Sequence, residues 1–199
     1  MTRLLVLACL VVLLPEAAWA HTPIQGIGDF YSGVLHPWVV PQHILPIVAL
    51  GLLLGQRGEE FFQAGLGSFL VAILLGLAAA GAGFQGIPEV VLLVLSTLEG
   101  VAVALAPPLP RSACVALAFA TALLVALDSS PEASTLRATL MTLGGTAIGA
   151  SLGLIYSGGL SRKLAAPWAR IAVRVVGSWI AASSVLVLAL ATVGKAPAK

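Results

Sequence analysis

Residues 36–55 read HPWVVPQHILPIVALGLLLG, a stretch in which two of the chain's three histidines, His36 and His43, stand at the start of an apolar run. Such a run is typical of a membrane-spanning helix, and ionisable or metal-ligating side chains at membrane depth are unfavourable unless they have a role. Two interpretations are open. The pair binds a metal ion, or both rings bond to water and loop carbonyls at the membrane interface.

The composition places the whole chain in a membrane. Hydrophobic residues make up 59% of the sequence and charged residues 9%, and the mean hydropathy is +1.06. Soluble domains carry about 25% charged residues. The formal net charge is only +2, and no basic cluster is present, so the sequence gives no support to nucleic-acid binding.

Six apolar runs, each near the length needed to cross a bilayer, predict an all-α membrane protein with six transmembrane helices. The runs cover residues 38–55, 64–84, 88–106, 112–128, 138–160 and 171–193. Their connections are too short to fold alone, so we expect a single transmembrane domain over residues 38–193. An exterior segment (21–37) precedes it, and an exterior tail (194–199) follows it.

Residues 1–20 have the pattern of a cleavable signal peptide. Arg3 supplies the positive charge, an apolar segment follows, and Ala18-Trp19-Ala20 is a small-residue cleavage motif. Secretion of the N-terminus and six spans would leave both ends of the mature chain outside a bacterial inner (cytoplasmic) membrane. The positive-inside rule agrees, because five basic residues then fall inside and three outside. The five are Arg57, Arg111, Arg162, Lys163 and Arg170, and the three are Arg137, Lys195 and Lys199.

Prolines around the histidines decide whether the two rings can share an ion. On a straight helix, residues seven apart are separated by about 10 Å along the axis, too far for one ion. Pro37 and Pro41 each lack the N–H that a helix interior needs. Pro41 suits the first position of a helix, which places His43 in the first turn and His36 in an irregular segment before it. A break there makes convergence of the rings feasible.

Neutral imidazole suits nickel, cobalt, copper and zinc, and Gln42 offers an additional carbonyl oxygen. Glu99, inside the third run, is a further candidate ligand or relay, or else the structural partner of Arg174. After signal cleavage, His21 would be the N-terminal residue. It forms either a second, exterior metal site or a chain end without function.

The sequence also bears on catalysis and on helix packing. No nucleophile–base motif occurs, so we expect neither an enzyme nor a tightly bound cofactor. Gly145, Gly149 and Gly153 form a small-residue stripe on the fifth run. Such a stripe lets helix backbones approach closely, either inside the bundle or across a homo-oligomer contact.

The first span resembles the HupE/UreJ family of small membrane proteins, whose signature there is H-P-x-x-G-x-D-H. His36, Pro37 and His43 match it in register, whereas Val40 replaces the motif glycine and Gln42 the motif aspartate. The resemblance implies a nickel or cobalt permease, or a membrane accessory protein beside hydrogenase or urease. Loss of the aspartate removes a negative charge that would help to dehydrate a divalent cation.

A second element near the end, Arg174-Val-Val-Gly177-Ser178-Trp179, also resembles the family. We expect structural roles for Arg174 and Trp179 there, as for Pro37 and Pro41 at the first span. The partners expected from the sequence are therefore the lipid bilayer and a divalent metal ion such as Ni²⁺ or Co²⁺.

Overall fold

The computed structural model describes residues 27–84, 89–130, 135–164 and 166–193, and every regular element in these ranges is an α-helix. The predicted signal peptide, His21 and the tail at 194–199 lie outside the described residues. The helices are α2 (Asp29–Val39), α3 (Pro41–Gly55), α4 (Glu59–Gly81), α5 (Glu89–Leu105), α6 (Arg111–Asp128), α7 (Leu136–Lys163) and α8 (Pro167–Val193).

The first predicted span is broken, as the prolines indicated. α2 and α3 meet at Val40 with a bend of 72°. Val40 is extended (φ −95°, ψ 110°), the conformation favoured before a proline, and Pro41 is the first residue of α3. The expectation that His36 lies in an irregular segment is wrong, because α2 is helical through Val39 with Pro37 inside it.

α2 is held in place by an unusually close approach to α7. A Cβ at Gly149 would lie 2.1 Å from the carbonyl oxygen of Val34, and one at Gly145 would lie 2.1 Å from that of Phe30. Gly33 meets the backbone of α7 in the same way. Small residues thus replace the side-chain layer between the two helices. The glycine stripe is covered by the chain's own helices and presents no free face to a second copy.

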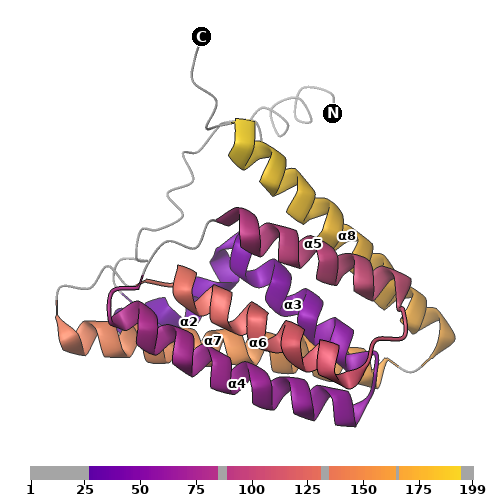
Figure 1. The fold of residues 1–199 in the computed structure, drawn as a ribbon, viewed down its shortest axis with the longest axis horizontal. Coiled ribbons are helices and arrows are strands. Elements are labelled where there is room, and N and C mark those ends of the chain that lie inside the picture. Colours follow the sequence, from indigo (N-terminus) through magenta and orange to yellow (C-terminus); the bar gives the residue numbers. More distant parts are fainter. Residues whose placement is uncertain (1–26, 85–88, 131–134, 165, 194–199) are drawn as a thin grey trace, which may run out of the picture.

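α3 is the central helix of the bundle, and it contacts all six of the others. Around it, α2 packs on α7, α4 on α6, and α5 on α8. Figure 1 shows α8 crossing α5 and diverging from α4, α6 and α7. Leu50 and Phe69 belong to an apolar core that includes residues of α3, α4, α6 and α7, and Leu53 and Val103 belong to a second core among α3, α5 and α8.

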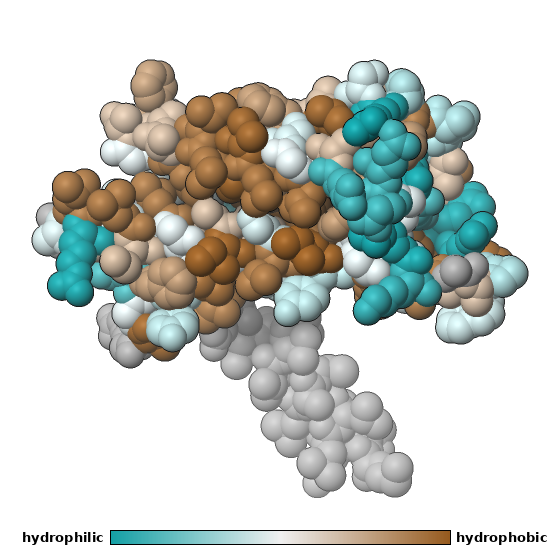
Figure 2. Space-filling model, turned by 90° about the horizontal axis from the view of Figure 1, so that it is seen from below, coloured by the Kyte–Doolittle hydropathy of each residue, from teal (hydrophilic) through white to brown (hydrophobic). Residues whose placement is uncertain are grey.

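Four helices are long and apolar enough to cross a membrane, and the bent pair α2–α3 brings the number to five. α5, with 17 residues, is at the short end of the range for a spanning helix. Figure 2 shows apolar side chains over much of the visible face, with hydrophilic ones gathered mainly at its right-hand end. The chain is therefore a multi-pass, all-helical membrane protein.

Candidate metal site

The bend at Val40 brings the two histidine rings together. The ring centroids of His36 and His43 are 5.1 Å apart, and the rings are inclined at 61°. Two imidazoles that each bind a tetrahedral ion at about 2 Å have ring centres about 5 Å apart. The spacing across the break therefore fits a shared ion, which a straight helix would not allow.

His43 also has a carboxylate partner that the sequence analysis missed. Its Nε2 atom lies 2.8 Å from Oδ2 of Asp128, the last residue of α6. The His43 side chain is 1% exposed and that of Asp128 18% exposed. The sequence offered one signal for this contact. In a six-span chain the start of the first span, near His43, and the end of the fourth, at Asp128, lie on the same side of the membrane.

The pairing defines what His43 can offer to a ligand. When Nε2 carries the ring proton, it donates a hydrogen bond to Asp128, and Nδ1 keeps a free lone pair. Nδ1 is buried and has no hydrogen-bond partner among the described residues. Metal-binding histidines commonly have this arrangement, with a carboxylate that fixes the tautomer and strengthens the ligand. In this tautomer, Nδ1 is the nitrogen that His43 could offer to a ligand.

Gln42, the other candidate ligand at the start of α3, precedes His43 in the chain. Gln42 is buried beside His43 in the first turn of α3. No group of three or more histidine, cysteine or acidic side chains that could hold a metal ion occurs in the described part of the chain. The arrangement is therefore two imidazoles and one orienting carboxylate, which resembles a transient binding point more than a closed structural metal site.

Glu99 lies deeper in the bundle, apart from the histidines. Its side chain is 1% exposed, and its Oε1 atom accepts a hydrogen bond of 2.6 Å from the Thr121 hydroxyl on α6. Its Oε2 atom is buried without a hydrogen-bond partner among the described residues. Thr121 and Asp128 are seven residues apart on α6, or about 10 Å along the helix. Asp128 and the Thr121 hydroxyl that bonds to Glu99 therefore lie on the same face of α6.

The suggested pairing of Glu99 with Arg174 is wrong. Arg174 is exposed, and its Nε atom donates a 2.6 Å hydrogen bond to the carbonyl of Ala104 in the last turn of α5. This contact satisfies a carbonyl that the end of a helix leaves unpaired. Trp179 is 67% exposed on α8. In the same motif it is Gly177 that packs on α5, where Val103 would contact any added Cβ.

Comparison with known proteins gives one family. The model of the family described as HupE / UreJ protein matches residues 8–187. Neither the curated proteins nor the solved structures contain a match.

Proposed function

Because the chain belongs to the HupE / UreJ family, we propose that it moves a divalent transition-metal ion, nickel or cobalt, across the bacterial inner membrane. The observation that carries the proposal is the convergence of His36 and His43 at the broken first span. Imidazole nitrogens suit these borderline ions, whereas magnesium and calcium prefer oxygen ligands. The bound ion is cargo, so an open and incomplete ligand set favours its release.

Asp128 supplies the negative charge that the sequence lacks at Gln42. The family signature has an aspartate where this chain has Gln42, and a carboxylate helps to strip water from a divalent cation. Asp128 returns a negative charge to the histidines from α6, 2.8 Å from His43 Nε2. The motif aspartate is therefore replaced by Gln42 in the sequence, but a carboxylate from α6 still lies next to His43.

We infer that the ion then passes inward along α6 toward Glu99. The hydrogen bond to Thr121 holds one carboxylate oxygen, and the other faces a buried position without a hydrogen-bond partner among the described residues. A buried acid in a membrane segment is by default a candidate for an ion or proton pathway. Counting the bent pair α2–α3 as one span and adding the 17-residue α5 to the four long helices gives the six spans that the proposal requires.

Uptake by intact cells tests the proposed function. Cells that express the wild-type protein should accumulate Ni²⁺ or Co²⁺ faster than cells that express His36→Ala/His43→Ala. Cu²⁺ and Zn²⁺, measured in parallel, define the selectivity. Equal accumulation of every metal in both strains would contradict a transport function.

Asp128→Asn is expected to weaken metal binding about 10- to 100-fold, the usual effect of removing a partner that orients a ligating histidine. Asparagine retains a hydrogen-bonding oxygen but not the negative charge. Titration of the purified protein with Ni²⁺ measures the effect. Asp29→Asn is the matched control, because Asp29 is an exposed acid at the start of α2. Wild-type affinity in Asp128→Asn would exclude a role for this carboxylate.

Glu99→Gln is expected to lower metal flux by about tenfold or more while leaving binding at the histidines unchanged. Glutamine keeps an oxygen that accepts the Thr121 hydrogen bond, so the fold should be retained. Flux into liposomes and Ni²⁺ titration separate the two properties. Glu89→Gln, at the start of the same helix, is the control. Normal flux in Glu99→Gln would give Glu99 a structural role only.

The alternative is a membrane accessory protein that binds metal for hydrogenase or urease maturation without moving it. A small ligand set suits this alternative as well as transport, because an accessory protein must also release the ion; no cluster of three or more ligating side chains occurs in the ranges that the structure describes. Such a protein could receive an ion and pass it to a partner. It would bind metal at His36 and His43 but give no flux when it is the only protein in a liposome.

A further inference from the structure

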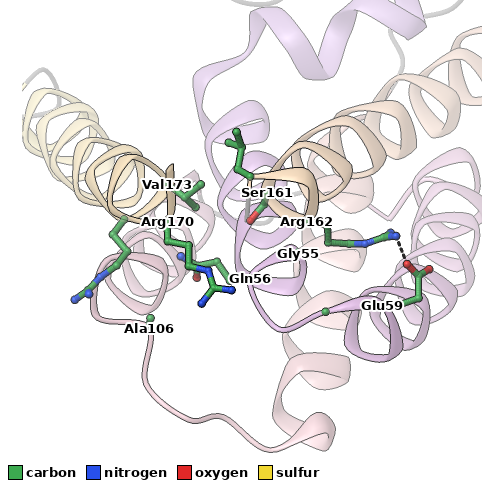
Figure 3. Close-up of a pocket in the computed structure, with 11 residues that line it drawn as sticks. Gly55, Gln56, Glu59, Ala106, Ser161, Arg162, Arg170 and Val173 are labelled. Atoms are coloured by element: carbon green, nitrogen blue, oxygen red, sulfur yellow. Dashed lines mark ion pairs between the residues drawn. The ribbon is translucent and has the colours of Figure 1, made fainter. Parts of the chain in front are cut away.

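The end of the bundle opposite the histidines contains a cavity of about 550 Å³. It lies where α3 and α7 end and α8 begins. Figure 3 shows one lining residue of each helix, Gly55 of α3, Ser161 of α7 and Arg170 of α8. α7 and α8 make few contacts with each other, and both contribute residues to the cavity lining, as does the end of α3 with Gly55 and Gln56. No step of metal binding at the histidines uses it.

The lining is strongly basic. Three arginines contribute to it, Arg162, Arg170 and Arg174, against a single acid, Glu59. Glu59 is already neutralised by its ion pair with Arg162, whose guanidinium also lies 5.1 Å from the centroid of the Phe62 ring. Arg170 and Arg174 therefore remain as an uncompensated double positive charge.

The geometry of these two side chains leaves donors available. Arg174 uses only Nε, toward the Ala104 carbonyl, and its terminal nitrogens form no hydrogen bond with other described residues. The Arg170 side chain has no hydrogen bond or ion pair in the described part of the chain, and it is exposed. Guanidinium groups bind phosphate oxygens in a bidentate manner and suit such a position. The same charge would repel a departing divalent cation, so the cavity is unsuited to metal exit.

Apolar side chains on both flanking helices indicate what kind of phosphate would bind. Leu160 of α7 is 56% exposed, and Trp168 and Ile171 of α8 are 71% and 62% exposed. Leu160 precedes the lining residue Ser161 on α7, and Ile171 follows the lining residue Arg170 on α8, so exposed apolar residues adjoin the basic lining along both helices. Exposed tryptophan is typical of the depth at which lipid headgroups lie. A free phosphate ion would use the arginines but not this apolar surface.

We propose that the cavity binds the headgroup phosphate of an anionic phospholipid, whose acyl chains lie along α7 and α8. Basic pockets between transmembrane helices on the cytoplasmic side bind anionic headgroups in this way. The lipid would fill the gap between two helices that contact each other little, and so hold α8 in position against α3 and α5.

Titration with phosphatidylglycerol tests the proposal on the purified full chain in neutral detergent, with native mass spectrometry as the readout. The first phosphatidylglycerol molecule should bind more tightly than phosphatidylcholine. Arg170→Gln should weaken it about fivefold and Arg170→Gln/Arg174→Gln about thirtyfold. Arg111→Gln/Lys163→Gln is the matched control, because it removes two basic groups from the same end outside the cavity lining. The control should bind like wild type.

Two results would overturn the proposal. One is equal affinity of wild type and the double cavity variant for phosphatidylglycerol. The other is arginine-dependent binding of inorganic phosphate that displaces the lipid, which would make the site one for a free anion. The single variant Arg170→Gln is expected to fold normally, since this side chain has no hydrogen-bond or ion-pair partner among the described residues, so its weaker lipid binding can be assigned to the lost charge. Ni²⁺ affinity should stay at the wild-type value in all variants, so the outcome is independent of the proposed transport function.

Discussion

His36→Ala/His43→Ala is expected to abolish Ni²⁺ binding, with each single variant weakened on the order of 100-fold or more. The loss should exceed that from removing an outer partner, which is about 10- to 100-fold. The reason is geometric, since the rings are 5.1 Å apart and an ion between them depends on both. Calorimetric titration of the purified protein measures the affinities. Co²⁺ should follow the same order.

The single variant His36→Ala tests metal binding without removing the hydrogen bond between His43 and Asp128. It leaves the buried His43–Asp128 hydrogen bond intact, whereas His43→Ala leaves Asp128 without this partner. We expect Ni²⁺ to raise the Tm of the wild-type protein and to produce no such rise in His36→Ala, with the metal-free Tm of each protein as its own reference. Wild-type metal affinity in His36→Ala would show that the two histidines do not share an ion.

Gly149→Ala is expected to destabilise the protein by about 1–3 kcal/mol, the usual effect of overpacking a tight contact. The new Cβ would lie 2.1 Å from the Val34 carbonyl oxygen, and backbone cannot move aside as a flexible side chain does. Val34 is two residues before His36 on α2. Displacement of α2 should therefore also weaken Ni²⁺ binding. Thermal unfolding and metal titration on the same samples measure both effects.

Gly144→Ala is the matched control on the same helix. Apart from its chain neighbours and the backbone of its own helix, no atom lies within 4 Å of the added Cβ, so the variant should gain the helix-propensity advantage of alanine over glycine, about 0.5–1 kcal/mol. The two substitutions are chemically identical, and their effects should have opposite signs. Equal Tm values for Gly144→Ala and Gly149→Ala would contradict the described packing of α2 on α7.

Helix positions could be predicted from the sequence where apolar length decided them. The predicted run at 112–128 corresponds to α6 (Arg111–Asp128), and the proline pattern placed the start of α3 at Pro41. α2 could not be predicted in this way. It contains Pro37, and its stability comes from glycine contacts with α7, more than a hundred residues away in the chain. Tertiary packing thus overrides a local helix-breaking signal.

The site could be predicted only in part, for a similar reason. The histidine pair and the need for a break were visible in residues 36–43, because both are local. The His43–Asp128 contact joins residues 85 positions apart, and nothing in either segment alone indicates it. Likewise Glu99 bonds to Thr121 and not to Arg174, because the packing of α5 against α6 and α8 decides the partner. The roles of Gln42 and Glu99 in metal handling remain predictions.

Metal flux into liposomes that contain only this protein tests the central claim most directly. A metal-sensitive dye inside the vesicles reports entry of Ni²⁺ or Co²⁺ down a concentration gradient. We predict entry with the wild-type protein and background signal with His36→Ala/His43→Ala, at equal amounts of folded protein. Background signal with the wild type, despite tight Ni²⁺ binding, would contradict transport and favour the accessory role.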